Sequence, residues 1–166
     1  MPEKETVERA RRDQREGKAP STQAGEFVRE EIHHIREGKH GARSTQQAIA
    51  IGLSKARRAG VALKPPQEGA ASEETRESAK RAYDEGQGRT HPKPRPRVAK
   101  AVRSALKREG SAAASPEALS RQARAAAARK TSAERSAAAK KAVRTKGPAK
   151  RSAAAKKAAR TRSAES

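Results

Sequence analysis

The sequence predicts an all-α fold class, with a small N-terminal helical module followed by an extended basic tail that is largely disordered or nascent-helical. Three observations lead to this prediction. Apolar residues recur at spacings of three and four, which is typical of helices. Glycines and Ser/Thr residues separate the segments that show this spacing. Only 33% of the 166 residues are hydrophobic, so large apolar side chains are too few to offset the ordering entropy of the whole chain.

Charge is distributed unevenly along the chain. Residues 1–68 carry a net charge of +4 and residues 69–90 a net charge of −1, whereas residues 91–166 hold 22 Lys and Arg against four acids, a net charge of +18. These ranges give the predicted domain organisation: a helical module, a helix with its linker, and an Ala/Lys/Arg-rich tail. The surplus of positive charge favours a polyanionic partner.

Two copies of the tetrapeptide REGK separate the first three predicted helices, which run over about 3–16, 22–37 and 45–59. Each copy supplies a glycine, Gly17 or Gly38, that permits the left-handed C-cap conformation. Ser-Thr-Gln follows each copy and offers a hydroxyl group to the free N–H groups of the next helix. The repeated pattern therefore predicts two helix-to-helix joints, not a catalytic loop.

Helix caps and an apolar stripe define the second and third of these helices. We expect the second helix to begin at Thr22 and the third at Ser44 or Thr45. Their apolar residues keep a helical spacing and form one stripe, which we expect to pair with a second copy of the chain or another protein. The stripe consists of Phe27, Val28, Ile32, Ile35, Ile49 and Leu53.

The same two helices also suggest a helix-turn-helix motif. The third helix would then present polar and basic side chains to the bases of DNA, namely Gln46, Gln47, Lys55, Arg57 and Arg58. A recognition helix needs a rigid supporting core, and the apolar residues here are few. Base-specific recognition is therefore the less favoured alternative.

No catalytic, metal or cofactor site is predicted. His33, His34 and His40 are close in sequence, but no cysteine or well-spaced acid completes a set of metal ligands, so we expect surface histidines. No serine has a plausible His and Asp partner set, and the phosphate-loop pattern is absent. We expect neither an enzyme nor a small-molecule substrate.

Beyond the module, Ser72 is expected to start a helix over about 73–85, and residues 86–96 form an extended, proline-rich linker. Four alanine-rich basic helices are predicted in the tail, over about 97–109, 116–130, 131–147 and 151–162. Thr131 and Glu134 have the spacing of a capping box. Isolated helices of this length are marginal in water.

The last two tail helices carry a repeat with a period of 16: residues 135–145 read RSAAAKKAVRT and residues 151–161 read RSAAAKKAART. Their cations cluster on one face and alanines lie opposite. When Lys and Arg side chains neutralise phosphate groups, counterions are released from the nucleic acid, and this drives binding that does not depend on the base sequence. The residues predicted to bind nucleic acid are Arg121, Arg124, Arg129, Lys130, Lys140, Lys141, Arg144, Lys150, Arg151, Lys156, Lys157, Arg160 and Arg162.

Two resemblances accompany these patterns. The run GEFVREEIHHIREGKHGARSTQQAIAIGLSKARRAGV over residues 25–61, with ARRDQREGKAPSTQA before it, resembles a family of small basic bacterial proteins of uncharacterised function. The Ala/Lys-rich repeats over about 115–166 resemble the tails of bacterial histone H1-like proteins. The first resemblance implies a specific helical module without naming an activity, and the second implies DNA binding.

The expected function is therefore DNA binding with little sequence preference, in the bacterial cytoplasm and associated with the nucleoid. The chain lacks cysteine, a segment of 18 apolar residues and a secretory signal pattern. Membrane-surface binding is disfavoured because alanine, not Leu, Phe or Trp, lies opposite the cations. A protein-interaction adaptor and an RNA- or ribosome-binding protein remain the alternatives.

Overall fold

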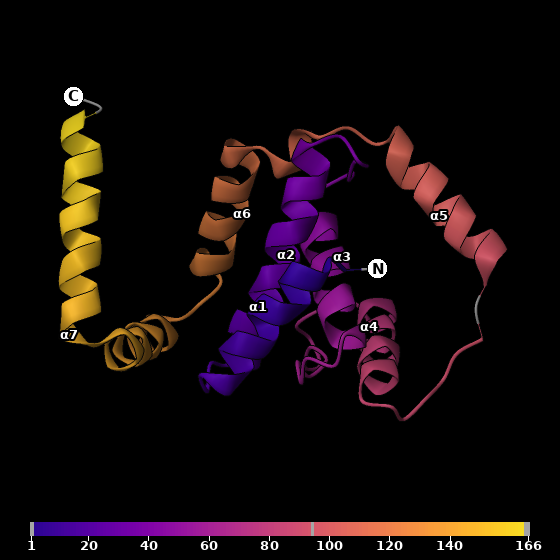
Figure 1. Cartoon of the computed structure of the whole chain (residues 1–166), viewed down its shortest axis with the longest axis horizontal. Helices are drawn as coiled ribbons and strands as arrows, with labels where there is room; N and C mark the ends of the chain where they lie inside the picture. Colours follow the sequence, from indigo (N-terminus) through magenta and orange to yellow (C-terminus); the bar gives the residue numbers. More distant parts are fainter. Residues whose placement is uncertain (1, 94, 165–166) are drawn as a thin grey trace. The chain divides into compact units, whose positions relative to one another are not determined.

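In a computed structural model, the chain consists of helices joined by turns and loops (Figure 1). The structure describes residues 2–93 and 95–164, apart from the side chains of residues 145, 146, 149–151, 154, 157, 158, 161, 162 and 164. No strand occurs in the described ranges, so the all-α prediction is confirmed. The elements are α1 (Lys4–Arg15), α2 (Pro20–Arg36), α3 (Thr45–Arg58), α4 (Glu73–Gly86), α5 (Pro96–Arg108), the 3-10 helix η1 (Ala112–Ala114), α6 (Pro116–Ala128) and α7 (Ser132–Ala164).

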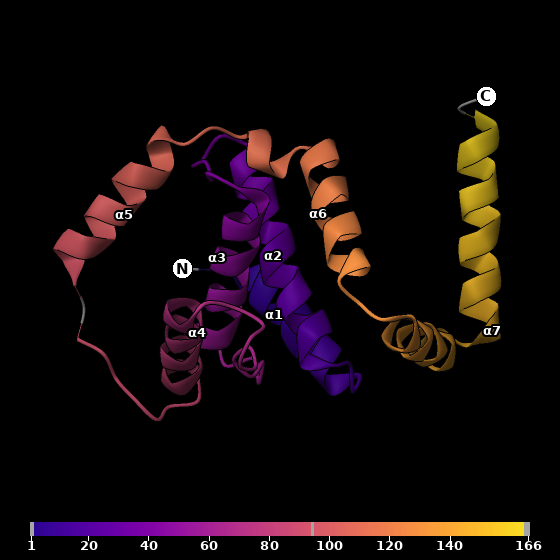
Figure 2. The ribbon, with the colours of Figure 1, turned by 180° about the vertical axis from the view of Figure 1, so that it is seen from behind.

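The chain divides into two compact units, Met1–Gln122 (unit 1) and Ala123–Ser166 (unit 2). In unit 1, each of the first four helices packs against the next: α1 on α2, α2 on α3 and α3 on α4. Figures 1 and 2 show this order from opposite sides. Gly52 lets α3 approach α2 closely, because a Cβ atom there would lie 2.7 Å from the Cα atom of Val28.

Two apolar clusters stabilise unit 1. The first surrounds Phe27, which is fully buried between α1, α2 and α3. The second surrounds Ile35, also fully buried, in the C-terminal half of α2. Burying one side chain of this size stabilises the folded state by about 1.5–3 kcal/mol. Most other buried members are alanines, so these two residues dominate the apolar contribution.

The two REGK joints have the predicted helix-ending geometry. Gly17 and Gly38 adopt φ angles of 69° and 72°, in the left-handed region. The backbone N–H of Lys18 donates to Asp13 O at 2.9 Å and that of Lys39 donates to His34 O at 3.0 Å. These are the bonds of a Schellman motif, which satisfies carbonyl groups at a helix C-terminus.

The predicted N-caps are confirmed at α3 but not at α2. Ser44 caps α3, since its hydroxyl group accepts a hydrogen bond from the backbone N–H of Gln47 at 3.1 Å. The prediction of Thr22 as the cap of α2 was wrong, because α2 already begins at Pro20. Proline suits the first helical position, where its fixed φ angle is helical and its missing N–H is not needed.

A segment from the predicted tail completes the second apolar cluster. Ala113 and Ala114 of η1 are buried against α2 and α3. The hydroxyl group of Thr45 donates to Ala113 O at 2.7 Å, and the backbone N–H of Gly41 donates to Leu106 O at 2.8 Å. Unit 1 therefore extends well beyond residue 91, where the sequence places the start of the tail.

α4 is held on α3 by small buried residues and by polar contacts. Ala79 and Ala82 are its buried residues. Arg58 Nε donates to Glu85 Oε2 at 3.0 Å, and the Gln87 side chain donates to Gly60 O at 3.3 Å. The predicted helix after Ser72 is confirmed, and Ser72 caps it by accepting from the N–H of Thr75.

Unit 2 contains α7, which is interrupted at Gly147. This glycine has φ 65° and ψ 168°, which is not helical, and Pro148 follows it. At the start of α7, Thr131 and Glu134 form the predicted capping box, with the N–H of Glu134 donating to Thr131 Oγ1 at 3.2 Å. In the described part of the chain, no helix combines the length and apolarity needed to cross a membrane.

Candidate functional site

The predicted nucleic-acid-binding residues lie on α6, on α7 and in the turn between them. All side chains of this set that the structure describes are exposed: Arg121, Arg124, Arg129, Lys130, Lys140, Lys141, Arg144, Lys156 and Arg160. The side chains of Lys150, Arg151, Lys157 and Arg162 lie outside the described part.

The interruption of α7 places one copy of the 16-residue repeat on each side of Gly147. In the first copy, Lys140 and Arg144 are four residues apart and so lie on one helix face. Lys156 and Arg160 have the same relationship in the second copy. Each half of α7 is therefore a separate basic helix with the same pattern of cations.

Acidic residues do little to offset this charge. Unit 2 holds 14 Lys and Arg and only two acids. One of the acids, Glu134, is committed to the capping box, where its carboxylate accepts from the backbone N–H and the hydroxyl group of Thr131 at 2.8 and 3.0 Å. These two hydrogen bonds lower the pKa of Glu134. The capping box therefore engages this carboxylate at the start of α7.

The predicted interaction stripe requires a correction, because the chain itself covers it. Phe27 and Ile35 are fully buried, and Ile32 is 8% exposed. Val28 is half-buried against the second apolar cluster and Leu53 against the first; Ile49 is also half-buried. The stripe is the interior of unit 1 and offers no continuous apolar surface to another chain.

The geometry of α3 also counts against the helix-turn-helix hypothesis, because only Gln46 and Arg58 of its five named side chains are exposed. Of the side chains that α3 would present to DNA, Arg57 is buried and donates to the carbonyl groups of Leu63 and Lys64 at 3.1 and 3.4 Å. Its burial lowers the pKa of its guanidinium group. The side-chain oxygen of Gln47 accepts from the backbone N–H of Arg43, and Lys55 Nζ lies 2.6 Å from the buried carboxylate of Glu31. These three residues support the fold of unit 1.

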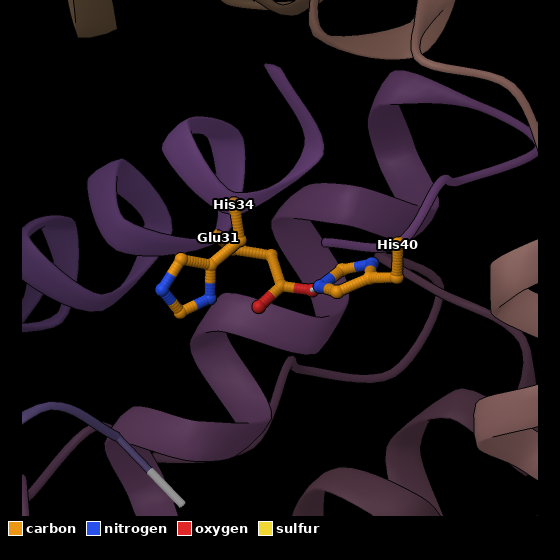
Figure 3. A group of neighbouring side chains, drawn as sticks. All are labelled: Glu31, His34 and His40. Carbon is orange, nitrogen blue, oxygen red and sulfur yellow. Dashed lines mark ion pairs between the residues drawn. The ribbon is translucent and has the colours of Figure 1, made fainter. Parts of the chain in front are cut away.

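A group of titratable side chains lies between α2, the α2–α3 turn and α3. We call it the buried cluster: Glu30, Glu31, His34, His40 and Lys55. The exposed fractions of Glu30 and Glu31 are 4% and 0%. Lys55 Nζ lies 2.6 Å from Glu31 Oε2 and 3.5 Å from Glu30 Oε1. Figure 3 shows the rings of His34 and His40 on either side of the Glu31 carboxylate.

His34 is oriented by the segment that precedes α1. Its Nε2 atom lies 2.8 Å from Glu3 Oε1, while its Nδ1 atom lies 4.0 Å from Glu30 Oε1, inside the cluster. Lys39 also approaches Glu3, with its Nζ atom 3.4 Å from the same oxygen. The hydrogen bond from His34, with help from Lys39, lowers the pKa of Glu3.

His40 is oriented by the backbone of the α2–α3 turn. Its Nδ1 atom lies 3.1 Å from the carbonyl oxygen of Gly41, and its Nε2 atom lies 3.2 Å from Glu31 Oε1. Although Lys55 and His40 are close to Glu31, neither meets it with hydrogen-bonding geometry. Both oxygens of Glu31 are buried and accept no hydrogen bond from the described residues.

The prediction of surface histidines was wrong for two of the three. The side chains of His34 and His40 are 12% and 16% exposed, whereas that of His33 is 66% exposed. A well-spaced acid does exist, because Glu31 precedes His34 by three residues and shares its helix face. That Glu-x-x-His spacing was the signal that sequence reasoning missed. The contribution of His40, from a turn, had no such signal.

No protein-family model, curated protein or solved structure matches the chain.

Proposed function

We propose that the chain binds duplex DNA without sequence preference, through the basic helices of α6 and α7, as a nucleoid-associated protein of the bacterial cytoplasm. The observation that supports it most is the arrangement in unit 2 of two matched basic repeats on separate helices. The described cations Lys140, Arg144, Lys156 and Arg160 are exposed and take part in no ion pair in the described part of the chain. Such side chains are available to phosphate groups.

The chemistry of these helices favours the DNA backbone over base edges. Specific reading uses bidentate contacts from a helix held rigidly in the major groove, whereas the repeats combine cations with alanine and serine. Aromatic platforms for stacking on single strands are missing, since Phe27 is buried and Tyr83 is the only other aromatic residue. Backbone neutralisation is the interaction that remains.

Helix formation in α7 is proposed to depend on the bound polyanion. Alanine is the best helix former, but repulsion between Lys140, Lys141 and Arg144 opposes the helix in free solution. DNA phosphates relieve this repulsion. The tail is then largely disordered or nascent-helical when free and becomes helical when bound, whereas unit 1 is folded.

The experiment measures the affinity of the full chain for a 30-base-pair duplex by fluorescence anisotropy. The triple variants K140Q/K141Q/R144Q and K156Q/K157Q/R160Q remove the cations of one repeat each. Glutamine keeps a similar helix propensity. We expect each variant to weaken binding at least tenfold and by a similar factor. The matched control R11Q/R12Q/K80Q removes three exposed cations from unit 1 and should weaken binding much less.

Two results would count against the proposal. If the control triple weakens binding as much as the repeat triples do, net charge and not the repeats controls affinity. If structured RNA displaces the protein from duplex DNA at physiological salt while DNA does not displace it from RNA, the partner is RNA. Equal weakening of DNA binding by the two repeat triples, together with a preference for duplex DNA over structured RNA, would support the proposal.

A further inference from the structure

We propose that Glu31, His34 and His40 form a binding site for a divalent transition-metal ion of the zinc class. A carboxylate and two imidazoles are ligands that Zn²⁺ uses with one or more further positions open. One ligand atom from each residue lies within 4.8 Å of the others (Figure 3). Bonds from zinc to N and O are about 2.0–2.2 Å long, so small side-chain adjustments bring the three atoms onto one ion.

The hydrogen bonds of the two imidazoles match those of metal-binding histidines. A histidine ligand usually donates its second ring N–H to a carboxylate or a backbone carbonyl, which fixes the tautomer and the ring orientation. His34 Nε2 faces the carboxylate of Glu3 at 2.8 Å, and His40 Nδ1 faces the carbonyl of Gly41 at 3.1 Å. His34 Nδ1 and His40 Nε2 are therefore left as the ligand atoms.

Glu31 supplies an independent reason for a cation at this position. Its side chain is fully buried, and neither oxygen accepts a hydrogen bond from the described residues. If His40 donates its Nδ1–H to Gly41, its Nε2 atom carries a lone pair that faces Glu31 Oε1 at 3.2 Å. Two lone pairs at this distance repel unless a proton or a metal ion lies between them.

The charges of the buried cluster also favour a cation. With neutral imidazoles, Glu30 and Glu31 carry two negative charges against the single positive charge of Lys55. Lys55 lies nearest to Oε2 of Glu31, at 2.6 Å, and so leaves Oε1 to the ion. Because the ammonium group repels a second cation, replacing Lys55 with glutamine should tighten zinc binding.

The test is a calorimetric titration of Zn²⁺ into the untagged full chain after removal of metals with a chelator. We expect one ion per chain. His34→Gln and His40→Gln should each weaken the binding at least tenfold. His33→Gln is the matched control, because His33 is the next residue on α2 but its exposed ring pairs with Glu37 instead. This control should bind zinc as the unchanged protein does, and Lys55→Gln should bind it more tightly.

The variants lose contacts inside unit 1, so a second measurement uses the unchanged protein. Nitrogen-15 spectra of the imidazoles before and after addition of Zn²⁺ should show coordination through His34 Nδ1 and His40 Nε2, with His33 and His91 unaffected. Mg²⁺, which prefers oxygen ligands, should change none of them.

Three results would overturn the metal site. The first is that the full chain binds no zinc at about 100 μM Zn²⁺, a concentration that would load even a weak site. The second is equal weakening by His33→Gln and His34→Gln. The third is a His40 ring that stays doubly protonated in the presence of Zn²⁺. A proton, not a metal ion, would then lie between His40 Nε2 and Glu31 Oε1.

Discussion

The hydroxyl group of Thr45 donates a buried hydrogen bond of 2.7 Å to the carbonyl oxygen of Ala113, 68 residues further along the chain. Nearby, Arg36 Nε donates to the carbonyl oxygen of Ala114 at 2.8 Å. These bonds attach η1 to the ends of α2 and α3, where the second apolar cluster would otherwise be open to water. The start of the alanine-rich region therefore belongs to the folded unit, and the basic repeats begin beyond it.

Replacing Thr45 with valine should weaken this attachment. Valine keeps the shape of the side chain but leaves the carbonyl group of Ala113 without its buried partner, a loss of about 1–3 kcal/mol. Urea denaturation followed by circular dichroism measures the change. Thr22→Val, at an exposed position of α2, should change stability far less. Equal stability of Thr45→Val and the unchanged protein would show that η1 does not depend on this bond.

Two glycine-to-alanine substitutions should have opposite effects on stability. A Cβ atom at Gly41 would collide with the backbone of Glu109 and Gly110, so Gly41→Ala should destabilise unit 1 by about 1–3 kcal/mol. Gly25 lies within α2 with open space around it, so Gly25→Ala should stabilise by up to about 1 kcal/mol. Urea midpoints measure both. Stabilisation by Gly41→Ala would contradict the packing of residues 109–110 on the α2–α3 turn.

The capping box of α7 should lose stability in acid. The pKa of Glu134 is lowered from 4.5, first by the backbone N–H of Thr131 and then by its hydroxyl group. A lowered pKa means that the carboxylate stabilises the folded state above pH 4.5 and that this contribution is lost as the pH falls through the folded-state value. Carbon-13 titration of the carboxyl group should show the low pKa in the unchanged protein and in Thr131→Ser. Thr131→Ala removes the hydroxyl group but keeps the backbone N–H, so it should bring the pKa only part of the way back toward 4.5. An unchanged pKa in this variant would rule out the contribution of the hydroxyl group.

If α7 must be helical to bind DNA, then glycine substitutions that leave every cation in place should weaken binding. Ala138 and Ala139 lie opposite the basic face, and each glycine costs about 1 kcal/mol of helix stability. We expect A138G/A139G to reduce affinity by up to about thirtyfold, the equivalent of 2 kcal/mol, and to reduce the helicity gained on adding DNA. The loop variant A70G/A71G is the control. Full affinity of A138G/A139G would indicate that the tail binds in an extended form.

Apart from the start of α2, the local features of the fold could be predicted from the sequence, because each depends on neighbouring residues. Gly38 ends α2, Ser44 caps α3, and Thr131 with Glu134 starts α7, all as the sequence indicates. The place of η1 could not be predicted, because Ala113 belongs to a run of small residues without the periodic large apolar side chains that mark a buried helix face.

The two candidate sites also differ in how far the sequence predicts them. The basic repeats are visible in the sequence because they are contiguous, and the structure assigns each copy to its own half of α7. The buried cluster depends on tertiary contacts: His40 reaches Glu31 from a turn and Lys55 reaches it from α3. The spacing of the apolar stripe predicts a buried helix face, but it does not distinguish burial by another chain from burial by the same chain.

The salt dependence of DNA binding shows whether the repeats of α7 contact the phosphate backbone. The logarithm of the binding constant should fall linearly with the logarithm of salt concentration, with a slope of about −0.9 for each phosphate contact. Replacing the six cations of both repeats with glutamine (Lys140, Lys141, Arg144, Lys156, Lys157 and Arg160) should reduce the magnitude of the slope by up to about 5. The control variant replaces six exposed cations of unit 1, namely Lys4, Arg11, Arg12, Arg15, Arg43 and Lys80. It should keep most of the magnitude of the slope. Equal slopes for the two six-residue variants would contradict the account.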